Sequence, residues 1–365
     1  MNQIPDTKNH DPKIFAWLIS GCALIFLMVI IGGITRLTHS GLSITEWNLI
    51  MGAFPPVTEN QWQVLFEKYQ QSPEFREVHY YFNLPDFKKI FWWEYSHRLI
   101  GRLTGIVFIV PFFYFLIKKK ISKYLLTKLI NIFLLGALQG ILGWYMVISG
   151  LADKPSVSHY RLAAHLILAF CTFGYTFWVA MNLLPRENSS TAEGELPAFE
   201  INRLQWLQKI FKCLFGLIIL QIIFGAFVAG LKAGYLYPTF PKMGDNWIAP
   251  EVKILISENN LLGFFEEGAP VQFIHRCLGV LIFLFSTGIW LYSKRVDFPP
   301  AIQLATRVLM LVVMLQFFLG ILTLIKSVPL HLAAMHQAGA FLLFATALYL
   351  LNKVGHNARY QKENN

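Results

Sequence analysis

Long apolar stretches alternate with shorter polar connections over nearly the whole chain. Eight of these stretches, each of roughly 17 to 26 residues, carry few or no charges, and a helix of that length can cross about 30 Å of hydrocarbon. They lie near residues 14–35, 96–117, 129–149, 161–184, 208–231, 272–293, 305–325 and 330–352. The pattern predicts an all-α polytopic membrane protein with eight transmembrane helices.

The composition supports this prediction, because 55% of the 365 residues are hydrophobic and only 14% are charged. Soluble domains carry about 25% charged residues. The four cysteines all fall inside predicted spans, where we expect them to pack as small apolar side chains. The predicted outer loops therefore offer no disulfide and no CxxC redox pair.

The formal net charge of +10 is sorted by membrane side. Lysine and arginine concentrate in the connections after the second, fourth, sixth and eighth spans, so the positive-inside rule places these connections, and both termini, in the cytoplasm. This distribution explains the basic charge without a nucleic-acid partner. The residues before the first span lack the Arg-rich, acid-poor character of a mitochondrial transit peptide, and a bacterial cytoplasmic (inner) membrane is the simplest compartment.

Three sequence frames recur in the same order in the two halves of the chain. EYSHRLIGRLTG at 94–105 matches QFIHRCLGVLIF at 272–283, ALQGILG at 137–143 matches MLQFFLG at 314–320, and RLAAHL at 161–166 matches LAAMHQ at 332–337. Three ordered matches indicate an internal duplication. Because four spans return the chain to its starting side, the repeats are expected to be related by an axis along the membrane normal.

The duplication predicts two pseudo-symmetric four-helix bundles joined by a cytoplasmic linker. The amino-terminal half covers residues 1–184 with a long outer loop at 36–95, the linker covers 185–207, and the carboxyl-terminal half covers 208–365 with a long outer loop at 232–271.

An additional helix is predicted inside the first outer loop. Thr58 and Gln61 have the spacing of a capping box, and apolar residues follow at helical intervals. These residues are Trp62, Leu65, Phe66 and Tyr69. Such a helix either lies on the outer membrane surface or packs on the core of its own loop.

Four histidines occur near the starts of the even-numbered spans, at matched depth near the outer face. They are His97, His165, His275 and His336. Bundle cores build cofactor sites from side chains on facing helices, and haem iron accepts two axial imidazoles. The pattern therefore predicts one bis-histidine haem site in each half, with His97 paired to His165 and His275 to His336. The other histidines, His79 among them, are expected to be solvated or interfacial.

Arginines accompany the histidines near the outer surface. Arg98 and Arg276 directly follow His97 and His275, and Arg161 precedes His165 by four residues. A guanidinium binds a carboxylate with two hydrogen bonds, which makes these arginines candidates for binding haem propionates. The alternative is that they extend to lipid headgroups.

Glu94 distinguishes the two halves. It precedes His97 by three residues and so shares its helix face, while the corresponding residue of the second half is Gln272, which cannot act as a base. A carboxylate is costly in an apolar setting and marks a functional site there, although an acid is also favoured near a helix amino terminus. The asymmetry places the expected chemistry in the first half.

The chain resembles the haem A synthase family, in the branch shared by mitochondria and many Gram-negative bacteria. The likeness covers about residues 30 to 345 and is carried by GGITRLTHSGLSITEW at 32–47, GAFPP at 52–56, FWWEYSHRLIGR at 91–102, LQGILGWYMVISGL at 138–151, YRLAAHL at 160–166, GAFVAGLKAGYLYPTFPKMG at 225–244 and QFIHRCLG at 272–279. Some members carry a cysteine pair in the first outer loop, which this chain lacks, so a relay built on that pair does not transfer.

The resemblance implies an oxidoreductase that converts the C8 methyl of haem O into a formyl group, making haem A for terminal oxidases. It implies that Glu94 is the essential acid, that His97 and His165 flank the substrate haem, and that His275 and His336 ligate a cofactor haem b. Haem O synthase and oxidase assembly factors are the expected partners, with membrane lipid around the protein and homo-oligomerisation left open.

Two other functions are alternatives to this one. A bis-histidine cytochrome b that only transfers electrons explains the four histidines equally well but not the difference between Glu94 and Gln272. A proton-coupled transporter fits poorly, because its site would lie at the midplane of the membrane rather than near one face.

Overall fold

The computed structural model describes residues 11–46, 51–152, 157–184, 198–296, 298 and 300–364. Within them, eight helices are long and apolar enough to cross a membrane, and no strand forms, which confirms the predicted all-α membrane class. These helices are α1 (Pro12–Leu37), α4 (Leu84–Ile117), α5 (Lys123–Ala152), α6 (His159–Met181), α7 (Ala198–Gly230), α10 (Gly268–Ser293), α11 (Pro300–Ile325) and α12 (Leu330–Asn364).

The chain divides into two compact units, one covering Asp11–Thr176 and the other containing the described residues from Phe177 onward. In the first unit, α1 packs along α4, and the Trp17 indole of α1 donates a hydrogen bond of 2.8 Å to the Val107 carbonyl of α4. The outer loop of this unit holds a short 3-10 helix, η2 (Met51–Ala53), and the helices α2 (Glu59–Gln70) and α3 (Pro73–Glu77).

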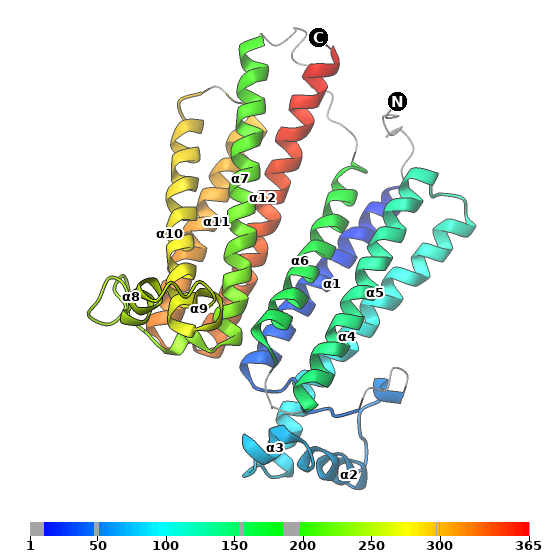
Figure 1. Cartoon of the computed structure of the whole chain (residues 1–365). Coiled ribbons are helices and arrows are strands. Elements are labelled where there is room, and N and C mark those ends of the chain that lie inside the picture. The colour runs from blue at the N-terminus through cyan, green and yellow to red at the C-terminus, as the bar shows by residue number, and fades with distance from the viewer. Residues whose placement is uncertain are drawn as a thin grey trace. The chain divides into compact units, whose positions relative to one another are not determined.

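The membrane helices α7, α10, α11 and α12 of the second unit form a closed arrangement (Figure 1). Helix α7 contacts α10 and α12, and α11 contacts the same two helices, so each helix has two neighbours. The outer loop of this unit contains η3 (Ala233–Tyr235), α8 (Pro250–Ser257) and α9 (Gly263–Glu266). Residues 185–197 of the predicted linker lie outside the described residues, and α7 already begins at Ala198.

Helix α4 begins about a dozen residues before the apolar segment that predicted it. Asn83 caps the helix by accepting a hydrogen bond of 3.1 Å from the Asp86 backbone N–H. At 34 residues the helix is about 51 Å long, well beyond the hydrocarbon thickness. His97 therefore lies well inside the helix, near the start of its apolar part only.

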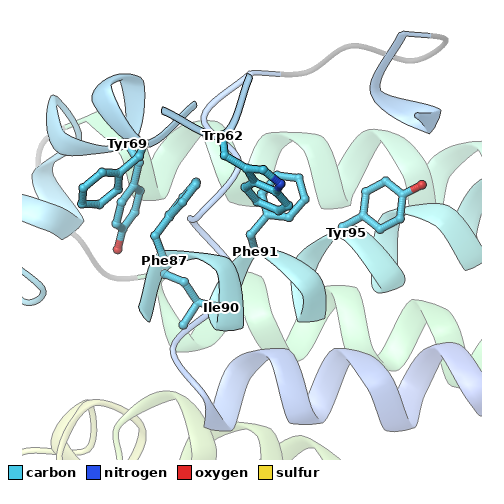
Figure 2. Close-up of a cluster of buried hydrophobic side chains, with 7 residues drawn as sticks. Trp62, Tyr69, Phe87, Ile90, Phe91 and Tyr95 are labelled. Atoms are coloured by element: carbon cyan, nitrogen blue, oxygen red, sulfur yellow. The ribbon is translucent and has the colours of Figure 1, made fainter. Parts of the chain in front are cut away.

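The predicted capping box at the start of α2 is confirmed. Gln61 N–H donates to the Thr58 hydroxyl at 3.3 Å, and Thr58 N–H donates to the Gln61 side-chain oxygen at 3.1 Å. The apolar face of α2 is buried against the amino-terminal part of α4 (Figure 2), so the helix packs on the core of its own loop. This cluster, the outer aromatic cluster, comprises Trp62, Phe66, Tyr69, Phe87, Ile90, Phe91 and Tyr95.

Candidate functional site

Each of the four predicted histidines packs against a glycine of the preceding membrane helix. A Cβ added to the glycine would lie 2.8 to 3.2 Å from a ring atom of the histidine, closer than nearly all real Cβ contacts. The four contacts join Gly32 of α1 to His97 of α4, Gly143 of α5 to His165 of α6, Gly225 of α7 to His275 of α10, and Gly320 of α11 to His336 of α12. Only glycine leaves room for an imidazole at these points.

The histidines fall into one pair per unit. His97 and His165 lie in the first unit, and His275 and His336 lie in the second. In the described part of the chain, no group of three or more His, Cys, Asp or Glu residues could hold a metal ion. Two imidazoles per unit are a donor set that suits haem, because the porphyrin supplies the other ligands of the iron.

The ring nitrogens of the second pair also fit such a group. The Nδ1 atoms of His275 and His336 are buried, and neither has a hydrogen-bond partner among the described residues. Buried polar atoms are normally satisfied. Imidazoles with unsatisfied nitrogens and without a third protein donor among the described residues therefore fit haem, which brings its own remaining ligands.

Glu94 is held by three donors next to the first pair. Its side chain is 3% exposed, and one carboxylate oxygen accepts hydrogen bonds from the Ser43 hydroxyl at 2.8 Å and from the Ile44 N–H at 2.7 Å. The other oxygen forms an ion pair of 2.5 Å with Arg98. A buried carboxylate needs this compensation, because an unpaired charge is strongly destabilising in such a setting.

Arg98 and Arg276 hold the chain that follows the preceding helix. Arg98 donates to the carbonyls of Ile44 and Glu46, both at 2.9 Å. Arg276 donates to the carbonyls of Tyr237 at 2.6 Å and Thr239 at 2.8 Å. Both guanidinium groups thus bind loop carbonyls in this structure, and their role toward propionates stays a prediction.

Gln272, the repeat counterpart of Glu94, and Arg161 each have simpler surroundings than Glu94. Gln272 is also buried, and its amide donates to the Tyr237 carbonyl at 3.3 Å. Arg161 lies with its guanidinium carbon 4.9 Å from the centre of the Tyr145 ring, which is a cation–π geometry. The two repeats therefore share the loop-binding arginine and differ in the acid.

A buried polar cluster in the first outer loop contradicts one expectation from the sequence. His79, expected to be solvated or interfacial, is 5% exposed, and its Nδ1 lies 2.7 Å from the Tyr69 hydroxyl, which also donates to Glu74 at 3.3 Å. Burial, and then the charge of Glu94, raise the pKa of Glu74 to about 8. Sequence patterns did not reveal this cluster, because it forms only when α3 packs against α2 and α2 packs against α4.

The glycine contacts were also missed, although a signal was present. Gly143 and Gly320 end the repeated frames ALQGILG and MLQFFLG, so their shared position relative to the histidines was visible in the repeat. What the sequence did not reveal is that each glycine faces a histidine of the next membrane helix.

Comparison with known proteins extends this picture. The model of the cytochrome oxidase assembly protein family matches residues 15–348. A protein of Nitrosomonas eutropha described as "Heme A synthase" is 44% identical over 348 residues, which make up 95% of each chain. Proteins with the same description from Nitrosospira multiformis (46% identical; 94% of this chain and 93% of the relative) and Flavobacterium psychrophilum (44%; 94% and 98%) are similar over nearly their full lengths.

Proposed function

Because the chain belongs to the cytochrome oxidase assembly protein family, together with haem A synthases that it matches over nearly its full length, we propose that it is an inner-membrane oxidoreductase that converts the C8 methyl of haem O into the formyl group of haem A. The observation that carries this proposal is the buried Glu94 in the first repeat, where the second repeat has Gln272. An acid in one unit alone supports chemistry there and electron transfer in the other.

In the first unit, His97 and His165 would bind the substrate haem, with Glu94 beside it. The conversion removes four electrons from the methyl carbon: in each of two hydroxylations the carbon takes up the oxygen of a water molecule, releases two protons and passes two electrons to an oxidant outside the chain. The resulting geminal diol then loses water. Glu94 would accept a proton from the attacking water or stabilise positive charge at the oxidised methyl carbon. Arg98, Ser43 and Ile44 fix the carboxylate in place through their hydrogen bonds.

In the second unit, His275 and His336 would hold a haem b as resident cofactor. When bound, haem b would supply one-electron transfer, because the two imidazoles would complete the ligand set of its iron. The unsatisfied Nδ1 atoms of both histidines support this assignment. We further propose that haem O synthase supplies the substrate and that oxidase assembly factors receive the product.

The test is the haem content of purified protein from cells that make haem O. We expect wild type to yield haem b together with haem O or haem A, and Glu94→Gln to retain both haems while producing no haem A. Haem b alone in the wild type would favour a plain electron-transfer cytochrome. Normal haem A production by Glu94→Gln would contradict the role of the carboxylate.

A further inference from the structure

Three of the four histidine-facing helices carry a glutamine one helical turn before the glycine. Gln139 precedes Gly143 on α5, Gln221 precedes Gly225 on α7, and Gln316 precedes Gly320 on α11. Residues four apart share a helix face, so glutamine and glycine both face the histidine of the next helix.

The glutamine side chains reach these histidines directly. The Gln139 amide nitrogen lies 3.2 Å from Nε2 of His165 and also 3.2 Å from its backbone carbonyl oxygen. The Gln221 amide nitrogen lies 3.3 Å from Nε2 of His275. The Gln316 amide donates to the backbone carbonyl of His336 at 2.8 Å.

The histidine helices provide space for these amides. In α10, a Cβ on Gly279, four residues after His275, would lie 3.5 Å from the Gln221 amide nitrogen. In α12, a Cβ on Gly339, three residues after His336, would clash with the Gln316 side-chain oxygen. In both helix pairs, a glycine on the histidine helix therefore leaves space for the glutamine of the preceding helix.

The side-chain oxygens of all three glutamines are buried and have no hydrogen-bond partner among the residues that the structure describes. The Nδ1 atoms of His275 and His336 are likewise buried and have no hydrogen-bond partner among the described residues. A histidine that binds metal through one ring nitrogen almost always donates the N–H of the other to an acceptor, which fixes the ring and raises its basicity. Each of these two helix pairs thus holds an unsatisfied acceptor on its glutamine and an unsatisfied ring nitrogen on its histidine, in side chains whose residues are already in hydrogen-bond contact.

We propose that Gln139, Gln221 and Gln316 are positioning residues, whose carboxamides fix His165, His275 and His336 in the orientation that binds haem. The first hairpin lacks this residue: Met28 of α1 occupies the position four residues before Gly32, and a thioether donates no hydrogen bond and accepts only weakly. The inference rests on the proposed function in one respect, namely which unit holds which haem.

The distribution fits the fates of the two haems. Both histidines of the cofactor pair face a glutamine, so the resident haem is held by two fixed ligands. Only one histidine of the substrate pair does, because Met28 occupies the corresponding position on α1. A haem that must enter and leave therefore has one ligand with greater freedom.

Methionine substitutions test the proposal, because they place at α7 and α11 the residue that α1 already has. We expect Gln221→Met and Gln316→Met to retain haem b about 10- to 100-fold more weakly. The haem b that remains should have a more positive midpoint potential, since its ligands lose basicity, and an altered low-spin ferric EPR signal, which reports the angle between the two imidazole planes. Gln221→Glu keeps an acceptor and should lower the potential.

Two controls separate positioning from general packing. Gln303→Met makes the same change on α11, where the amide donates to the Phe298 carbonyl and faces no histidine; it should leave haem b unchanged. Gln139→Met should weaken retention of haem O or haem A without affecting the haem b potential. If the Met variants do not accumulate in the membrane, Gln221→Glu and Gln316→Glu are compared with wild type in their place.

If Gln221→Met and Gln316→Met keep the wild-type midpoint potential and EPR signal, the inference is overturned and the proposed function stays intact. An unchanged midpoint potential in the Glu variants has the same consequence. Absence of haem b from the wild type would instead overturn the cofactor site itself.

Discussion

Replacing Gly320 by alanine is expected to expel the haem b that we propose for the second unit. A Cβ at this position would lie 2.8 Å from Cε1 of His336, whereas ordinary contact begins at 3.4 Å. The ring must therefore move by about 0.6 Å, while ligands keep their distances to a metal within about 0.2 Å. The displaced imidazole would lose its axial position.

The folding energy should change much less than the haem content. Alanine favours a helix by about 1 kcal/mol over glycine, whereas an overpacked methyl group costs about 1–3 kcal/mol. The net loss is at most about 2 kcal/mol, so Gly320→Ala should still fold. Gly216→Ala on α7 is the matched control, because nothing lies within 4 Å of its added Cβ.

Both variants would be purified in parallel, and haem b per polypeptide would be measured from the reduced pyridine haemochrome spectrum. We expect Gly320→Ala to lose most of its haem b and Gly216→Ala to keep it. Gly225→Ala, where the added Cβ would lie 3.2 Å from the His275 ring, should fall between them. Full haem b content in Gly320→Ala would refute the reasoning.

Three further predictions concern other parts of the molecule. His275→Ala should lose haem b while His97→Ala keeps it, as read from the haem extracted from each; haem b retention by both would contradict the assignment of the second pair. Burial raises the pKa of Glu74 from about 4.5 to about 8, so its contribution to stability is fully present below pH 4.5 and is lost as the pH rises through 8. The melting temperature should fall over that range in wild type and fall less in Glu74→Gln; equal slopes would show that Glu74 does not titrate there. Trp62→Ala should cost about 3–5 kcal/mol by opening the outer aromatic cluster, seen as early proteolysis of the first outer loop. If Trp62→Ala resisted the protease as well as the wild type does, the result would count against that packing.

The membrane spans and the four histidines could be predicted from the sequence, because hydropathy and the internal duplication are visible along the chain. The eight spans follow from hydropathy, and the histidines follow from the duplicated HR and LAA frames. The start of α4 was missed because Asp86, Lys88 and Lys89 interrupt the apolar pattern, although Asn83 and Pro85 supply a helix start. Hydropathy reports where lipid contacts a helix and does not report where the helix ends.

Contacts between helices could not be predicted in the same way. The approach of Gly320 to His336 depends on how α11 and α12 pack, and the burial of His79 depends on how α2 and α3 pack against each other. The glutamine and glycine of each frame were visible, but their meaning depends on the residue that faces them. The sequence therefore revealed the residues of the candidate site more readily than their contacts.

The length of α4 connects the outer loop to the proposed substrate site. The helix that carries Phe87 and Phe91 into the outer aromatic cluster continues without interruption to Glu94 and His97. Because α2 packs against α4, a displacement of α2 would move the same helix that carries Glu94 and His97. Amide protons of α2 and those around Glu94 should consequently exchange with solvent through the same opening event.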